Sequence, residues 1–216
     1  KSIANYSPDS AINRLNKALE LSIKNNYTFG QINALRFSAD MHSLISKYDT
    51  ALQILQRAFT IATNTKDVKN IINIHNLKGN ILLDKGNYQE AIGCYKTVLK
   101  LSNEINYYDG IAKGYASLGV GYYLIGDYTK AIDFYNEAIP KLELANDSVT
   151  LATLTSNLSS FYQLVGDFQM AIEVCKKSLS YTNKDDHVAQ ARIKINLGRN
   201  YTELQDHSKA LIYYKD

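Results

Sequence analysis

The 216-residue sequence contains no tryptophan, two prolines, two cysteines and only eleven glycines. So few helix-breaking residues favour long, uninterrupted elements. Lysine and arginine number 24 against 21 acidic residues, and the net charge of +3 is too small to indicate a surface for nucleic acid or for an anionic membrane. No apolar run approaches the roughly 18 residues of a membrane span. We therefore expect no direct nucleic-acid binding and no membrane contact from this segment.

The composition is that of a folded chain. Hydrophobic residues make up 45% and charged residues 21%, which argues against both a disordered chain and a collagen-like fibre. The sequence begins without a methionine and ends inside an amphipathic pattern. We therefore expect it to be part of a longer protein.

The sequence repeats itself with a fixed period of forty positions. The alanines that mark the period are Ala11, Ala51, Ala91, Ala131 and Ala171, and Ala210 follows one residue early. Twelve residues before an alanine of this series stands a second small residue, at Ala39, Gly79, Gly119, Ser159 and Gly198. A period of this size predicts a solenoid, in which stacked units bury a continuous core.

Each repeat contains two predicted helices. Apolar residues recur at steps of three and four, in the first helix at Ile111, Tyr115, Leu118, Tyr122 and Ile125. The Gly-Asp or Gly-Asn that follows ends one helix and caps the next. Pro140 removes the hydrogen bond to the carbonyl of Asn136, so we expect the second helix of that repeat to kink or end there.

The small residue, the aromatic residue three positions later, the Gly-Asp-Tyr turn and the following Ala-Ile resemble the tetratricopeptide repeat family. The period of forty exceeds the length of about 34 residues that is common in that family. The resemblance implies an all-α, right-handed α-α superhelix of antiparallel helix pairs. We expect a single solenoid over residues 1–216, with a lone second helix at about 7–25 and repeats at about 28–65, 67–105, 107–145, 147–183 and, truncated, 186–216.

The sequence shows no pattern typical of catalysis or metal binding. None of the four histidines pairs with another histidine or a cysteine at metal-ligand spacing. The segment Gly119–Gly126 lacks the dinucleotide-binding spacing, and no Gly-x-Ser-x-Gly turn occurs. Cys94 and Cys175 lie two repeats apart, which should exceed the ~7 Å Cα separation of a disulfide, so we expect unpaired apolar fillers. We expect no enzymatic activity, no metal and no cofactor.

The expected partner site lies on the first helices, which in this family line a concave groove. They are rich in amides and hydroxyls, and amides suit the backbone of an extended peptide because they both donate and accept hydrogen bonds. The candidate residues are Asn73, Asn76, Asn80, Lys113, Tyr123, Ser156, Asn157, Ser160, Arg192 and Arg199. Tyr123 is the expected apolar anchor, and the two arginines suggest an acidic or carboxylate-bearing ligand. The alternative, that these side chains only solvate an exposed helix face, stays open.

The resemblance also indicates a function. Repeats of this length occur in bacterial peptide receptors and in the N-terminal sensing regions of histidine kinases and helix-turn-helix regulators. We expect a non-catalytic module that binds a protein or peptide in the concave groove, as the sensing or scaffold region of a larger bacterial signalling protein. The alternatives are a stand-alone chaperone or assembly cofactor and a peptide-responsive regulator of an enzyme. The compartment is open: periplasmic for a sensor kinase, otherwise cytoplasmic.

Overall fold

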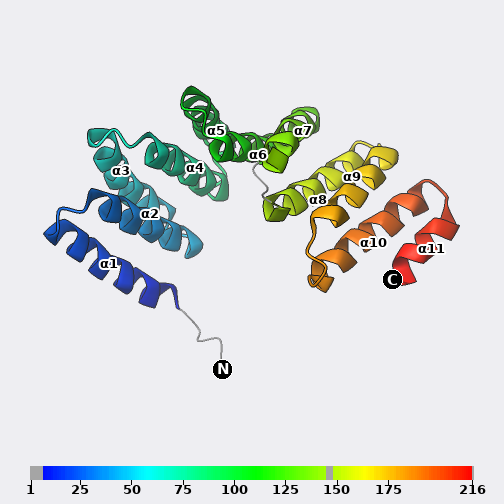
Figure 1. The fold of residues 1–216 in the computed structure, drawn as a ribbon, viewed down its shortest axis with the longest axis horizontal. Coiled ribbons are helices and arrows are strands. Elements are labelled where there is room, and N and C mark those ends of the chain that lie inside the picture. Colours follow the sequence, from blue (N-terminus) through cyan, green and yellow to red (C-terminus); the bar gives the residue numbers. More distant parts are fainter. Residues whose placement is uncertain (1–6, 145–147, 216) are drawn as a thin grey trace. The chain divides into compact units, whose positions relative to one another are not determined.

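The computed structural model describes residues 7–144 and 148–215, apart from the side chain of Val149. Regular structure in these ranges consists of eleven helices and no strand, which confirms the all-α prediction (Figure 1). The helices are α1 (Pro8–Lys24), α2 (Thr28–Leu44), α3 (Tyr48–Asn64), α4 (Val68–Asp84), α5 (Tyr88–Glu104), α6 (Tyr108–Leu124), α7 (Tyr128–Leu144), α8 (Ser148–Leu164), α9 (Phe168–Tyr181), α10 (His187–Glu203) and α11 (His207–Lys215). The expected boundary between repeats at residues 145–147 lies outside the described residues.

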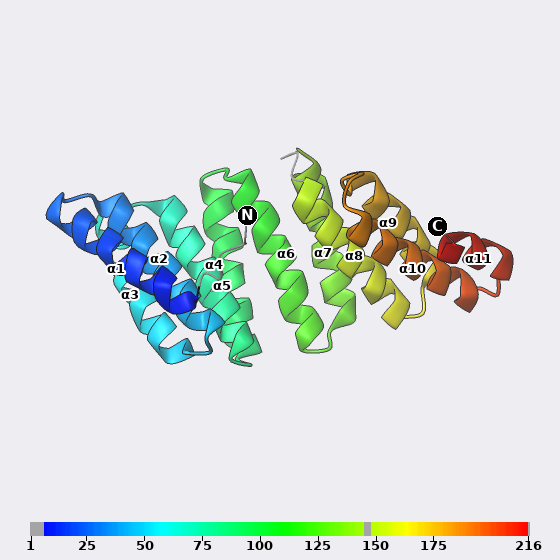
Figure 2. The same cartoon turned by 90° about the horizontal axis from the view of Figure 1, so that it is seen from below.

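The chain forms two compact units, an N-terminal unit (residues 1–110) and a C-terminal unit (residues 111–216), whose boundary falls inside α6. Within each unit consecutive helices lie side by side and antiparallel (Figure 1, Figure 2). The core of the N-terminal unit joins α2, α3 and α4, and the C-terminal unit has one cluster over α6–α9 and another over α9–α11. Each unit is thus a stack of helix pairs, as the repeat predicted.

The backbone repeats at half the period of the sequence. The first eight helices each have 17 residues and begin at residues 8, 28, 48, 68, 88, 108, 128 and 148. Every described three-residue turn that follows one of these eight helices has a positive φ at its second residue, at Asn26, Ser46, Lys66, Gly86, Asn106, Gly126 and Gly166. At Gly126 this conformation lets Asp127 N donate to Tyr122 O, which satisfies a helix-end carbonyl. The three-residue turns within and between repeats therefore share this conformation, although glycine occupies the position only in turns within a repeat.

The small residues of the first helices leave room for large side chains on the second. The rings of Tyr95, Tyr135 and Tyr214 pack directly on Gly79, Gly119 and Gly198, sixteen residues earlier in each case. Where the small residue is Ser159, the facing residue is the smaller Cys175, with 2.9 Å between Oγ and Sγ. Because a larger residue on the first helix faces a smaller residue on the second, the two helices of a pair can stay in close contact.

The pattern changes at α9, which has 14 residues instead of 17. Thr182 has an extended backbone (φ −75°, ψ 134°), and residues 182–186 form a five-residue connection to α10. A helix three residues shorter and a connection two residues longer make this unit one residue shorter than the others. This difference explains why Ala210 follows Ala171 one residue early.

Two local predictions have different outcomes. Pro140 does not end its helix, because α7 continues to Leu144 with the proline inside it. Pro140 and Asn136 are both exposed, so water can reach the carbonyl that loses its hydrogen bond, and the helix can continue. The prediction for the cysteines is confirmed, since Cys94 and Cys175 are both buried and neither forms a disulfide.

Candidate functional site

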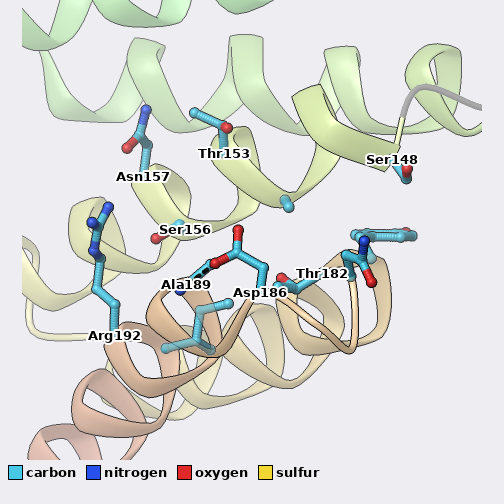
Figure 3. A pocket seen from close by; sticks show the side chains of 12 residues that line it. Ser148, Thr153, Ser156, Asn157, Thr182, Asp186, Ala189 and Arg192 are labelled. Carbon is cyan, nitrogen blue, oxygen red and sulfur yellow. Dashed lines mark hydrogen bonds between the residues drawn. The ribbon is translucent and has the colours of Figure 1, made fainter. Parts of the chain in front are cut away.

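A cavity of about 510 Å³ in the C-terminal unit opens between the N-terminal halves of α8 and α10 (Figure 3). The five-residue connection and the end of α9 also contribute to it, so the cavity lies where the regular spacing of the helices is broken. Its lining consists of Ser148, Ala152, Thr153, Ser156, Asn157, Tyr181, Thr182, Asn183, Asp186, Ala189, Arg192 and Ile193. Most of these side chains end in a hydroxyl, an amide or a charge, which can bind polar groups of a ligand.

The connection that borders the cavity is held by its own hydrogen bonds. Asp186 caps α10, because its Oδ1 accepts from Ala189 N at 3.0 Å. The Gln190 side chain reaches back from the first turn of α10 and donates to the carbonyls of Asn183 and Lys184, both at 3.0 Å. These bonds set the position of Asp186 relative to α10 before any ligand binds.

Arg192 is the only cationic side chain in the lining. It is exposed, and it has no hydrogen bond or ion pair with another residue in the described ranges. In Figure 3 it extends from α10 on the side of the cavity where Asn157 of α8 lies. A guanidinium in this position can bind a carboxylate through two parallel hydrogen bonds.

Asn157 is connected to the core behind the cavity. Burial raises the pKa of Tyr135 to about 12, and a hydrogen bond with the Asn157 side chain acts in the opposite direction. Tyr135 belongs to α7 and is almost completely buried. Asn157 therefore helps to align α8 on α7 in addition to lining the cavity.

A three-residue cluster holds the Tyr181 side of the cavity. Lys177 Nζ lies 2.8 Å from Glu143 Oε1, and the Tyr181 hydroxyl donates to the same carboxylate. These two hydrogen bonds, that of Lys177 first, lower the pKa of Glu143, and the bond to Glu143 raises the pKa of Lys177. The charge of Lys177 is thus compensated within the unit, and Tyr181 is connected to α7.

The sequence comparison decides the family. The model described as "Tetratricopeptide repeat" matches residues 70–143 and 150–216, more than half of the chain. The chain belongs to the tetratricopeptide repeat family. No curated protein sequence matches it significantly, and the matched model indicates no family of enzymes.

Solved structures share the tetratricopeptide repeat fold at low sequence identity. BtubC (BKLC) from P. vanneervenii is 18% identical with a TM-score of 0.87, covering 98% of this chain and 89% of that one. A Rap protein complexed with Competence and Sporulation Factor is 13% identical with a TM-score of 0.68, covering 98% and 75%. A signal transduction ATPase with a tetratricopeptide repeat sensor, from Pyrococcus horikoshii, is 17% identical with a TM-score of 0.77, covering 96% and 35%. These likenesses concern the fold alone.

Of the ten residues predicted for the site, the structure brings three together in the cavity: Ser156, Asn157 and Arg192. Ser160 and Arg199 follow on the same two helices, beyond the lining, and Ser160 donates to the carbonyl of Ser156. These five residues and the two predicted on α6 belong to the C-terminal unit.

The predicted residues outside α8 and α10 lie elsewhere. Tyr123 on α6, expected as an apolar anchor, stacks its ring on Phe161 at 4.5 Å, so this ring face contributes to the core. Lys113 is exposed on the same helix. The three predicted asparagines, Asn73, Asn76 and Asn80, lie on α4 in the N-terminal unit. There, Asn80 Oδ1 accepts from the hydroxyl of Tyr95 at 2.8 Å.

The sequence-based site missed the connection before α10, including Asp186. The one sign of this connection in the sequence was the interval from Ala171 to Ala210, which is one residue shorter than the forty-residue period. Within the described residues, no group of histidine, cysteine and acidic side chains is arranged to hold a metal ion. The helices that the structure describes also include none with the length and apolar character to cross a bilayer.

Proposed function

We propose that this chain is a non-catalytic module that binds an extended peptide or a protein segment on the first helices of its repeats, and that the cavity between α8 and α10 is its principal binding site. The observation that carries this proposal is the convergence of Ser156, Asn157 and Arg192, from two different helices, on one open cavity. A cavity of 510 Å³ falls within the usual range of ligand sites, about 300–1,000 Å³. Its amides and hydroxyls match the donors and acceptors of a peptide backbone.

The lining favours binding over catalysis. It contains no histidine and no cysteine, and its single carboxylate, that of Asp186, caps a helix. General acid–base or nucleophilic catalysis needs a positioned nucleophile and base within hydrogen-bond reach. The cavity offers polar groups for recognition without such a pair.

We further propose that the module is the sensing or scaffold region of a larger bacterial signalling protein. Two proteins of similar fold support this context: the Rap protein, solved with Competence and Sporulation Factor, and the signal transduction ATPase with a tetratricopeptide repeat sensor. The full-length sequence tests this part directly. A histidine kinase or a helix-turn-helix domain in the same chain would support it, and a gene without another domain would contradict it.

The binding site can be tested with a random dodecapeptide display library selected on the immobilised protein. Ser156→Leu should fill the cavity and weaken a selected peptide about tenfold or more, measured by fluorescence polarisation. Ser160→Leu is the matched control, because Ser160 is one turn away on α8 and does not line the cavity. Equal affinity for the wild type and Ser156→Leu would place the binding site elsewhere.

A further inference from the structure

Another cavity, of about 310 Å³, opens in the N-terminal unit between α3 and α4, which lie side by side in Figure 1. The apolar part of its lining consists of Leu52, Leu55, Phe59, Ile74 and Leu82. The rings of Phe59 and His75 meet edge to face, with 5.5 Å between their centroids, so the wall already contains an aromatic pair. An apolar cavity of about 150 Å³ is enough for benzene, so this α3–α4 cavity can hold one aromatic ring with small substituents.

The C-terminal unit repeats the helices of this cavity eighty residues later. Helices α3 and α7 begin at residues 48 and 128, and helices α4 and α8 begin at residues 68 and 148. Leu82 on α4 therefore corresponds to Tyr162 on α8, and Gln56 on α3 corresponds to Asn136 on α7. The two units can be compared residue by residue at this position.

A tyrosine fills the corresponding place in the C-terminal unit. Tyr162 is almost completely buried in the cluster over α6–α9, and its hydroxyl accepts from Asn136 Nδ2 at 3.2 Å. Tyr122 and Tyr201 hold the same position of their repeats. A leucine lacks the outer half of a tyrosine ring and its hydroxyl. Beyond Leu82, the α3–α4 cavity thus lies where another repeat places the end of a phenol ring.

Two polar groups of the lining have no hydrogen-bond partner among the described residues. One is the side-chain amide of Gln56, the counterpart of Asn136, and the other is the buried Nδ1 of His75. Most buried polar atoms in proteins do have a partner. A ring hydroxyl both donates and accepts hydrogen bonds, so it suits such groups.

The charges of the lining favour a neutral ligand. Lys78 and Glu90 contribute one charge of each sign. Burial lowers the pKa of His75, and the neighbouring Lys78 lowers it further, so His75 is uncharged at neutral pH. A phenol with a pKa of about 10, like that of tyrosine, is also neutral there and enters an apolar cavity without the cost of burying a charge.

We infer that the α3–α4 cavity binds a small free phenol, with its ring in the apolar part of the lining and its hydroxyl on Gln56. Gln56 is exposed and Leu82 is buried, so this orientation places the opposite end of the ring against Leu82 and α4. A polypeptide attached at that end would collide with α4, which excludes a tyrosine side chain of a partner. The site is separate from the peptide site between α8 and α10 and shares no residue with it.

The probe is p-cresol, which is the tyrosine side chain without its backbone. It is titrated into the whole chain and followed by nuclear magnetic resonance of backbone amides. Saturable shifts should occur at the residues of α3 and α4 that line the cavity, and N-acetyl-tyrosinamide should bind there at least tenfold more weakly. The inference is overturned if p-cresol gives no saturable shifts at these residues, or if N-acetyl-tyrosinamide binds as tightly.

Gln56→Leu tests the hydrogen bond. Gln56 is exposed, so the variant should fold. It should weaken p-cresol about fivefold, the worth of one neutral hydrogen bond, and should not weaken toluene, which has no hydroxyl. Gln53→Leu is the matched control, because Gln53 is exposed on α3 and does not line the cavity. Unchanged p-cresol affinity in Gln56→Leu, or an equal loss for toluene, would refute the assigned hydroxyl position.

Leu82→Tyr tests the space, because its ring should occupy the cavity as Tyr162 does in the C-terminal unit. Binding of p-cresol should fall more than tenfold while the circular dichroism spectrum is retained. Wild-type affinity in the folded variant would overturn the inference, and if the variant does not fold, Gln56→Leu decides. Ser156→Leu at the peptide site should bind p-cresol like the wild type, so either proposal can fail while the other stands.

Discussion

Three glycines of one repeat, Gly79, Gly86 and Gly93, lie seven residues apart, and replacement of each with alanine should change stability in a different way. Gly79 lies under the ring of Tyr95, and a Cβ added there would come within 2.8 Å of Tyr95 Cδ1. Gly86 lies in the turn after α4 with a φ of +88°, and nothing is within 4 Å of an added Cβ. Gly93 is exposed inside α5 and also has open space around it. The same change, glycine to alanine, thus tests a packing contact at Gly79, a backbone conformation at Gly86 and helix propensity at Gly93.

The magnitudes follow from these three surroundings. Gly93→Ala should stabilise the protein by about 0.5–1 kcal/mol, because alanine loses less backbone entropy in a helix. Gly86→Ala should destabilise by about 1 kcal/mol, since the left-handed conformation costs about 1–2 kcal/mol and a stiffer unfolded chain offsets part of it. Gly79→Ala should cost about 1–3 kcal/mol, because Tyr95 is 1% exposed and cannot move into solvent without losing its packing.

Urea denaturation followed by far-ultraviolet circular dichroism measures the three differences as shifts in midpoint at constant slope. The expected order of stability places Gly93→Ala above the wild type and the other two variants below it. A Gly79→Ala variant as stable as Gly93→Ala would refute the packing of Tyr95 on Gly79. A Gly86→Ala variant as stable as the wild type would refute the role of positive φ at this helix end.

A compensating variant tests the packing argument again. The equivalent positions in the first complete repeat are Ala39 and Leu55, both buried in one cluster. Gly79→Ala combined with Tyr95→Leu reproduces this pair, so its cost should be smaller than the sum of the two single costs. Strictly additive costs would show that the two positions do not interact.

Two further predictions concern titratable groups. Glu143 has a lowered pKa in the folded state, so its pairing with Lys177 stabilises fully above the ordinary carboxyl pKa of 4.5 and is lost as the pH falls through the folded pKa. The melting temperature of Glu143→Gln should therefore decrease less than that of the wild type between neutral and acidic pH, and an equal decrease would contradict this. Burial raises the pKa of the Cys94 and Cys175 thiols, so a thiol reagent should react slowly with the native protein. After unfolding, both cysteines should react without prior addition of a reductant. Fast reaction of the native protein would contradict their burial.

Periodicity predicted the helices and their pairing well, because it reports local structure. The steps of three and four, the turn glycines and the small residues all reflect the backbone within a few residues. The half-period of the backbone was not visible, since Asn26 and Lys66 take the conformation that Gly86 takes elsewhere. At these turns the packing of successive helices fixes a positive φ that the residue type does not reveal. The continuation of α7 beyond Pro140 is the opposite case, in which the surroundings tolerate a residue that usually ends a helix.

The candidate site was predicted only in part. Ser156, Asn157 and Arg192 were recognised because they occupy equivalent faces of first helices, and that choice needs only the period. Their convergence on a cavity depends on where α9 ends and on the path of residues 182–186, which the sequence showed only as one missing residue. The pattern also could not show that Tyr123 packs on Phe161, which lies two helices further along the chain.

The sequence by itself determined that this protein consists of repeated pairs of helices, because apolar helix faces, turn residues and small packing residues recur at fixed positions in each forty-residue period. Only the tertiary structure decided which small residue faces which large one, which polar side chains are used inside the fold, and where a cavity remains. These outcomes depend on contacts between residues far apart in the chain, and such contacts arise only when the helices pack together.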